Sequence, residues 1–175
     1  KRSLIGFFAR LRNIHLNPYE NLQECQRIQE DILVKIQHVE KRIRLSKALI
    51  KGIKRELGTK RFIALTKAES QKIKDQISNH ENKLDEYQRI RQILSEIGDG
   101  IAFTYIDKWE IKPMTQRESP GFISDKIGGK VEDEFFRSMF EAGIIAIRND
   151  ITSCLRFADV TIPRGDGSCS LVECK

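Results

Sequence analysis

The end of the chain carries residues whose types and spacing could support phosphate chemistry. Asp159 precedes a run of turn-forming residues, and Glu173 and Lys175 follow it two positions apart. Strand-forming residues lie on both sides of that turn, so residues 157–175 predict a two-stranded hairpin. Because side chains alternate along a strand, Glu173 and Lys175 point to one face, and the hairpin can bring Asp159 beside them.

Two carboxylates at one spot repel each other unless a cation neutralises them. A hard divalent ion with oxygen ligands meets that need, and Mg²⁺ or Mn²⁺ fits it. A nearby ammonium group can orient a water molecule or stabilise charge on a phosphate. The pattern therefore predicts a metal site at Asp159 and Glu173, with Lys175 beside it.

An amphipathic segment precedes the hairpin. Residues 128–143 predict a helix that Gly143 ends. Its apolar face is expected to contain Val131, Phe135, Met139 and Phe140. Residues 144–147 then predict a short apolar strand. Glu132 is the acidic residue best placed to assist at a metal, with Glu134 second; the alternative is an ordinary acidic first turn.

The order of helix, strand and Asp…Glu-x-Lys hairpin resembles the PD-(D/E)xK nuclease superfamily, which has the restriction-endonuclease-like fold. The resemblance covers residues 120–175, with Ala158 where the motif name has Pro. It implies that Asp159, Glu173 and Lys175 are catalytic.

The same resemblance implies further ligands and a substrate. Glu132 would help to hold the metal, and the main-chain carbonyl of Cys174 would add a ligand. The activity implied is that of a Mg²⁺-dependent endonuclease acting on DNA, in a setting such as restriction or phage defence. The fold of that family continues past such a hairpin, so we expect the chain to be a fragment of a longer protein.

Residues 17–98 predict an antiparallel helical coiled-coil hairpin. Asn17-Pro18 predicts a helix start, and residues spaced alternately three and four apart from Leu22 to Leu57 form a heptad seam. A bend over residues 59–65 follows. This hairpin could fold on itself or build a homodimer or higher oligomer, and it could bind a further protein.

The second helix of that hairpin has recognisable ends. Thr66-Lys-Ala-Glu69 is a capping box that opens it. Gly98-Asp99-Gly100 is expected to break it. The connecting segment, residues 99–127, is then expected to hold a helix over 101–111 and a loop over 112–127. Residues 1–16 form a basic amphipathic segment that packs on a partner or, alternatively, contacts a membrane surface or nucleic acid.

Charge is divided unevenly along the chain. Residues 1–98 hold 21 Lys and Arg against 12 Asp and Glu, giving +9, whereas residues 99–175 hold 10 against 13, giving −3. The basic part could bind nucleic acid, and solvated lysine-rich helices are the alternative. Arg156 and Arg164, on either side of Asp159, are candidate nucleic-acid contacts.

Composition and missing motifs argue against several other classes of protein. The four cysteines show no zinc-ligand spacing and are expected to be small buried residues of a reduced, cytoplasmic protein. The sequence has no apolar run of transmembrane length, no P-loop and no G-x-S-x-G or H-E-x-x-H motif. The expected class is α+β, with the coiled-coil hairpin followed by a truncated nuclease-like core over residues 128–175.

Three functions remain open at this stage. The leading one is a metal-dependent nuclease acting on DNA, with the coiled coil as an arm for dimerisation or targeting. The second is a coiled-coil interaction protein whose nuclease-like domain is inactive. The third is a basic nucleic-acid-binding scaffold without metal, which would bind in the presence of a chelator and lose affinity steeply with salt.

Overall fold

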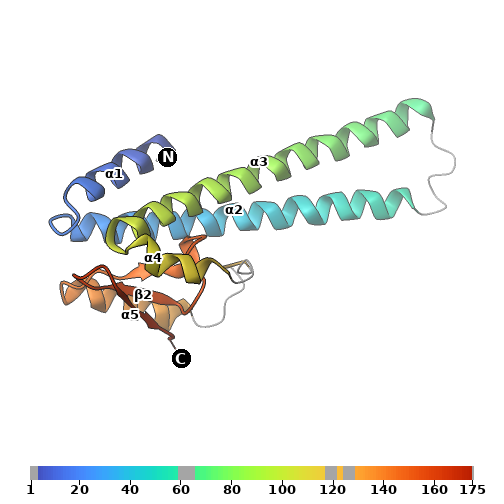
Figure 1. Ribbon diagram of the computed structural model, residues 1–175. Helices are drawn as coiled ribbons and strands as arrows, with labels where there is room; N and C mark the ends of the chain where they lie inside the picture. Colours follow the sequence, from blue (N-terminus) through green and yellow to red (C-terminus); the bar gives the residue numbers. More distant parts are fainter. Residues whose placement is uncertain (1–3, 59–65, 117–121, 124–128, 175) are drawn as a thin grey trace. The chain divides into compact units, whose positions relative to one another are not determined.

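The computed structural model describes residues 4–58, 66–116, 122–123 and 129–174 (Figure 1). The described part is mostly helical and has one three-stranded antiparallel sheet, which confirms the α+β class. Its contacts divide the chain into two compact units. We call residues 1–37 with 93–175 the core unit and residues 38–92 the coil unit. Both boundaries fall inside helices, because α2 (Leu22–Leu57) and α3 (Lys67–Tyr105) each belong to both units.

Helix α2 begins after Asn21 rather than at Asn17-Pro18. The carbonyl of Asn21 accepts the first hydrogen bond of the helix, from Cys25 N at 2.9 Å, and its side-chain amide donates to the carbonyl of Asn17 at 2.9 Å. The Asn17-Pro18 pair lies in the turn after α1 (Leu4–Leu16). The predicted start was wrong because Asn-Pro is typical of turns as well as of helix starts.

Helix α3 runs unbroken through Gly98-Asp99-Gly100, where the sequence predicted its end. Gly98 lies against the short 3-10 helix η4 (Asn149–Ile151), and a Cβ atom there would lie 2.2 Å from the carbonyl oxygen of Ile151. The carboxylate of Asp99 accepts hydrogen bonds from the backbone N–H groups of residues 153–154. The glycine thus permits close packing, and the aspartate fixes a loop.

The coil unit is the antiparallel pair of helices that the heptad spacing predicted. Glu40 and Arg91 form an ion pair at 3.0 Å, and Lys54 and Glu81 form another at 2.8 Å, so α2 and α3 run in opposite directions. The buried residues of α2 in this unit are Val39, Glu40, Ile43, Ser46 and Ile50. The predicted bend over residues 59–65 lies outside the described residues.

The capping box at the start of α3 is confirmed. The carboxylate of Glu69 accepts from the backbone N–H of Thr66 at 2.9 Å and from its hydroxyl at 2.8 Å, and Glu69 N donates to the Thr66 hydroxyl at 3.3 Å. These bonds hold the pKa of the exposed Glu69 carboxyl below its ordinary value, chiefly through the backbone donor.

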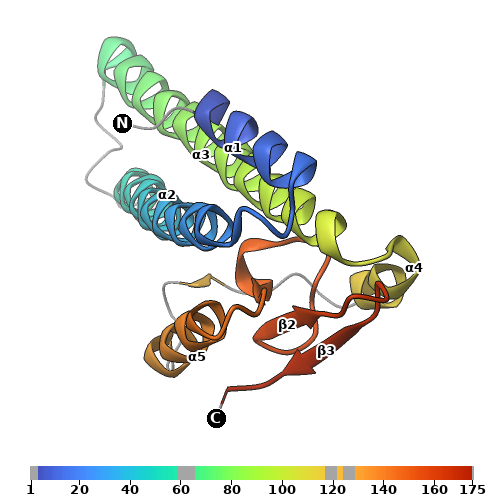
Figure 2. The same ribbon diagram turned by 90° about the vertical axis from the view of Figure 1, so that its left-hand side faces the viewer.

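The end of the core unit has the predicted order of a helix, a strand and a hairpin. After α4 (Lys108–Ile111) and the 3-10 helix η2 (Lys112–Gln116), helix α5 spans Gly129–Glu141. Three antiparallel strands follow in the order β1-β2-β3: Ile147–Arg148, Val160–Pro163 and Cys169–Val172. Gly143, with φ of +74°, ends the α5 turn as expected. Figure 2 shows α5 beside the sheet.

The buried face of α5 differs from the predicted one. Glu132, Phe136 and Phe140 are buried at a spacing of four residues, whereas Val131 is 47% exposed. The predicted face was wrong because it counted only apolar side chains, whereas the buried face of α5 includes the carboxylate residue Glu132. Among the described residues, no helix is long and apolar enough to cross a membrane.

Candidate active site

The hairpin brings Asp159 next to the segment that contains Glu173. Asp159 directly precedes β2, and Glu173 directly follows β3. The backbone N–H of Asp159 donates to Val172 O at 3.0 Å, and the N–H of Cys174 donates to Asp159 Oδ2 at 2.9 Å. Asp159 is half-buried and Glu173 is exposed. Lys175, the third predicted catalytic residue, lies outside the described residues.

The backbone on the other side of Asp159 is held by Asn149, the first residue of η4. Asn149 is 4% exposed, and its N–H donates to Asp159 O at 3.0 Å. Its side-chain amide donates to the carbonyls of Phe157 and Ala158, and its Oδ1 accepts from the Thr161 hydroxyl at 2.7 Å. One buried side chain therefore fixes both flanks of the turn that presents Asp159.

Ala158, the residue just before Asp159, has a positive φ of 64°. A left-handed conformation is disfavoured for residues with a Cβ atom and is retained only where surrounding contacts impose it. The Asn149 amide supplies such a contact, because it binds the Ala158 carbonyl at 3.3 Å. Ala158 in its strained conformation, and the buried Asn149 side chain that binds its carbonyl, thus lie immediately beside Asp159, the predicted metal-binding residue.

A second polar cluster joins α5 to β1. Arg148 forms an ion pair with Asp133 at 2.7 Å, and its guanidinium lies 4.1 Å from the centre of the Phe136 ring. Glu132, which is 7% exposed, lines a pocket of about 160 Å³ with these charged residues and Asp150. The Nε of Arg148 is buried with no hydrogen-bond partner in the described part of the chain.

The predicted ligand set is therefore divided in the structure. Asp159 is hydrogen-bonded to Cys174, the neighbour of Glu173, whereas Glu132 lies in the pocket with Arg148. Over residues 4–58, 66–116, 122–123 and 129–174, no three His, Cys, Asp or Glu side chains form a group that could hold a metal ion. The hairpin carboxylates fit Mg²⁺ in donor type, but Glu132 does not complete a three-ligand set with them.

The two predicted nucleic-acid contacts are engaged within the core unit. Arg156 Nε donates to Ser153 O at 2.7 Å. Arg164 is exposed, and its guanidinium donates to the Ser170 hydroxyl at 3.1 and 2.6 Å across the β2–β3 hairpin. Both arginines hold loop geometry, and Arg164 keeps the exposure that a phosphate contact needs.

The cysteine thiols do not supply a reactive nucleophile in the interior. Burial raises the pKa of Cys25 to about 11, against the opposing effect of hydrogen bonds with Tyr105 and Gln29. Burial likewise raises the pKa of Cys154 far above its ordinary value, and the nearby Asp99 carboxylate raises it further. Both buried thiols stay protonated near neutral pH, as expected for packing residues.

Comparisons with protein-family models, with curated proteins and with solved structures found no match to this chain.

Proposed function

We propose that the protein is a metal-dependent nuclease that hydrolyses phosphodiester bonds of DNA. The hydrogen bond from Cys174 N to Asp159 Oδ2 carries the proposal, because it brings the aspartate to the segment that contains Glu173 and Cys174. The helix, strand and hairpin order of α5, β1, β2 and β3 supports it. So does the strained Ala158 beside Asp159, since strain of this kind clusters at functional sites.

Asp159 and Glu173 are the residues that would hold Mg²⁺ or Mn²⁺, with the carbonyl of Cys174 as a further donor. A divalent ion, when bound, lowers the pKa of a water molecule and polarises the phosphate. Asp159 Oδ2 accepts the Cys174 N–H, and this hydrogen bond orients the carboxylate. Asn149 is a positioning residue, because it holds the backbone on both sides of Asp159.

Lys175 would act on the phosphate as a positive group, following Glu173 in the sequence by two residues. Its ammonium would stabilise negative charge that develops on the phosphate oxygens. Glu132 belongs to the separate cluster of α5 and β1, so it is not among the residues proposed to hold the ion. Its burial in a pocket with Arg148 and Asp150 gives it a fixed position rather than the freedom of a surface carboxylate.

The test is cleavage of supercoiled plasmid DNA by the protein in Mg²⁺ or Mn²⁺, beside an EDTA control. We expect Asp159→Asn, Glu173→Gln and Lys175→Ala each to reduce the rate at least about 100-fold, since one oriented charged group is worth about 10²–10³ in rate. Asp166→Asn is the matched control. Asp166 is an exposed carboxylate in the turn of the same hairpin, where it accepts from Ser168 N at 2.9 Å.

A second candidate function is a helical interaction protein with an inactive nuclease-like domain. The division of the carboxylates into two clusters favours it, because a weak ligand set would not retain a catalytic metal. Absence of cleavage with every divalent metal tested, together with intact folding, would replace the nuclease proposal by this one. Equal loss of cleavage in Asp166→Asn would refute the assignment of the site to Asp159.

A further inference from the structure

The positive charge of the chain is concentrated in the coil unit. Residues 38–92 hold 15 of the 31 Lys and Arg but 7 of the 25 Asp and Glu, a net charge of +8, and the rest of the chain, with 16 against 18, carries −2. Within the unit, residues 38–57 of α2 hold 7 against 2, whereas residues 67–92 of α3 hold 6 against 5. The excess therefore belongs to one helix rather than to the whole hairpin.

The cations on that helix form a ridge, which we define as Lys47, Lys51, Lys54 and Arg55. Successive members of the ridge lie four, three and one residues apart, and Lys47, Lys51 and Arg55 follow one another at intervals of four, so the ridge occupies one broad face of α2. Eight residues of helix separate the first from the last, a length of about 12 Å. One strand of duplex DNA presents a phosphate about every 3.4 Å along its axis, so this length corresponds to three or four phosphates.

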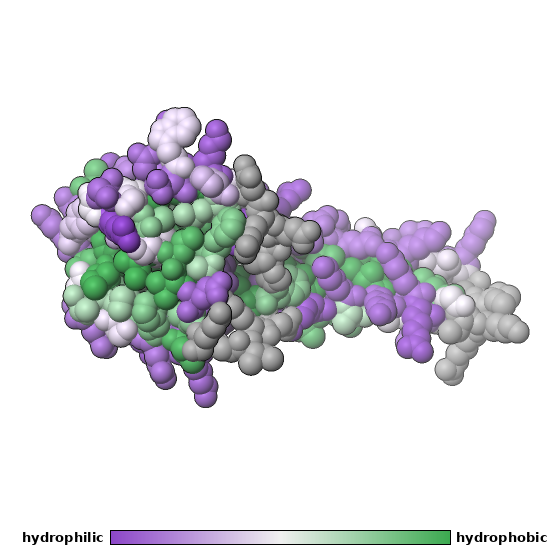
Figure 3. All heavy atoms as spheres, turned by 60° about the horizontal axis from the view of Figure 1, so that its bottom comes forward, coloured by the Kyte–Doolittle hydropathy of each residue, from purple (hydrophilic) through white to green (hydrophobic). Residues whose placement is uncertain are grey.

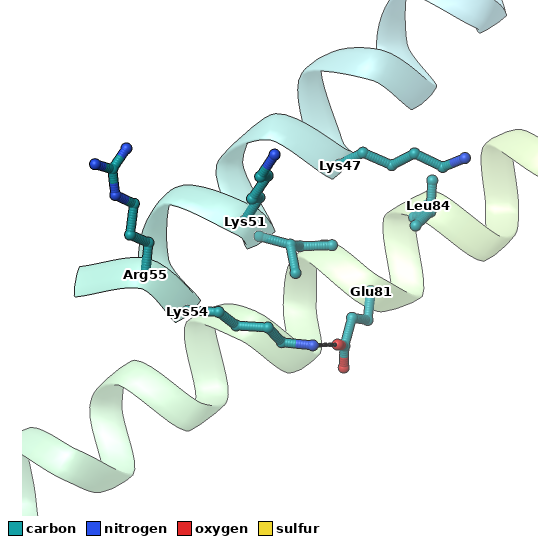
Figure 4. Close-up of a pocket in the computed structure, with 7 residues that line it drawn as sticks. Lys47, Lys51, Lys54, Arg55, Glu81 and Leu84 are labelled. Carbon is teal, nitrogen blue, oxygen red and sulfur yellow. Dashed lines mark hydrogen bonds and ion pairs between the residues drawn. The ribbon is translucent and has the colours of Figure 1, made fainter. Parts of the chain in front are cut away.

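The ridge is only partly neutralised by its own unit. Lys54 reaches Glu81 on α3 at 2.8 Å, as Figure 4 shows, while the charged ends of Lys51 and Arg55 point away from Glu81. In the described part of the chain, neither the Lys51 nor the Arg55 side chain makes an ion pair or hydrogen bond, and both residues are exposed. Like charges four residues apart repel each other along a helix, and an anionic ligand would relieve that repulsion.

The ridge lines an open groove of about 560 Å³ between α2 and α3. Only Ile50 and Leu84 among its seven lining residues are apolar side chains, and the aliphatic stems of the lysines supply the rest of its apolar wall. Figure 3 shows mostly hydrophilic residues over this part of the surface, with a narrow apolar strip between them. Two apolar residues are too few for the continuous stripe on which an amphipathic partner helix would dock.

We propose that this ridge binds the sugar–phosphate backbone of the nucleic-acid substrate. Closely spaced cations along one helix face match a polymer with closely spaced anions, and the short apolar floor can accept the apolar edge of a sugar. The ammonium groups act as point charges, which position a backbone without reading its sequence. This inference rests on the proposed nuclease function for its choice of ligand. Its test measures binding alone and does not depend on whether the protein cleaves DNA.

The test is the fluorescence anisotropy of a labelled 20-base-pair duplex titrated with the protein in EDTA, over a series of salt concentrations. The variant is Lys47→Glu with Lys51→Glu and Arg55→Glu. We expect binding at least tenfold weaker, and a slope of log affinity against log salt that falls by about three, roughly one unit for each phosphate that the variant no longer neutralises. A milder pair, Lys51→Gln with Arg55→Gln, keeps the test decisive if the triple variant misfolds, and should lower the slope by about two.

The matched control is Lys72→Glu with Lys74→Glu and Lys83→Glu, the same charge change on exposed residues of α3 in the same unit. Its affinity should change less than about threefold. Equal effects of the two triple variants would overturn the proposal that the ridge is the binding site, because binding would then follow net charge alone. Unchanged binding in the ridge variants would overturn it as well. Stronger competition by polyglutamate than by unlabelled duplex would also overturn it and would indicate an acidic protein partner. Loss of binding in the ridge variants without cleavage by the native protein would support the ridge and refute the nuclease.

Discussion

The core unit and the coil unit are held together in different ways. In the core unit, Gln29 of α2 is fully buried; its amide donates to Ala146 O at 2.9 Å, and its Oε1 accepts from Arg148 N at 3.0 Å. Bonds between segments more than a hundred residues apart therefore satisfy the backbone at β1, which among the described residues has a strand neighbour on one side only. A buried polar network of this kind fixes one arrangement of the segments.

The coil unit depends on a seam between two neighbouring helices. Five residues of α2 are buried there, but none of the α3 residues from 67 to 92 is fully buried. Two of the five, Glu40 and Ser46, are polar, and Glu40 is fully buried and pairs with Arg91 at 3.0 Å. Since burial drives most of folding stability, single substitutions should cost more in the core unit than in the coil unit. Three predictions can break or sharpen this contrast.

The largest effect is expected from Gly98→Ala in the core unit. The added Cβ atom would lie 2.2 Å from the carbonyl oxygen of Ile151, and backbone cannot yield as a flexible side chain can. We expect a loss of about 3 kcal/mol in the free energy of unfolding, measured by urea denaturation followed by circular dichroism.

Gly52→Ala in the coil unit is the control for that substitution. Gly52 lies inside α2, and nothing lies within 4 Å of a Cβ atom there. The same chemical change should therefore stabilise the protein, by about 0.5–1 kcal/mol, through helix propensity. A similar cost at both glycines would show that the contrast between the units is false.

The second prediction concerns Gln29→Leu, which keeps the volume of the side chain but removes both of its hydrogen bonds to β1. The carbonyl of Ala146 and the N–H of Arg148 would then be buried without their side-chain partner. We expect a loss of about 2–4 kcal/mol, because each unsatisfied buried group costs about 1–3 kcal/mol. Hydrogen exchange at Arg148 should accelerate with it. Gln26→Leu, on the same helix, should cost less than about 0.5 kcal/mol, since Gln26 reaches only Glu30, at 3.4 Å.

The features predicted correctly from the sequence are those that local spacing determines. The heptad seam gives the end of α2 at Leu57, and the capping box gives the start of α3, because both depend on residues within a few positions of one another. The hairpin at the candidate site was also predicted, since strand formers flank turn residues there. Its strands are shorter than expected, and they leave Asp159 and Glu173 just outside them.

The features missed are those that distant contacts determine. Gly98 was assigned to a helix break because its packing partner, Ile151, is 53 positions away in the sequence. Glu132 was expected to assist at the metal, and its place in a separate pocket was missed because the surroundings of that pocket come from β1 and α2. Asn149 matters at the candidate site through bonds to residues 8–12 positions further on, and an asparagine at a turn carries no local mark of such a role.

The smallest effect is expected in the coil unit, at the capping box. The pKa of Glu69 is lowered in the folded state. The stability that the charged carboxylate contributes is therefore fully present above the pKa of Glu in the unfolded chain, about 4.3. It is lost as the pH falls through the lower pKa of the folded state. We expect the first turn of α3 to fray progressively in acid, with the rest of the helix unaffected. Backbone chemical shifts of residues 66–70 measured by NMR between pH 7 and pH 2 report this directly.

Two variants separate the charge from the hydrogen bonds. Glu69→Gln keeps an acceptor in the capping box without a titrating group, so its first turn should be insensitive to acid. Thr66→Ala removes the hydroxyl that both donates to Glu69 and accepts from its N–H, and it should fray this turn at every pH. An equal acid response in Glu69→Gln would assign the titration to another group. If the acid-induced chemical-shift changes extended into the core unit, the coil unit would not be stabilised locally, as its partly exposed seam indicates that it is.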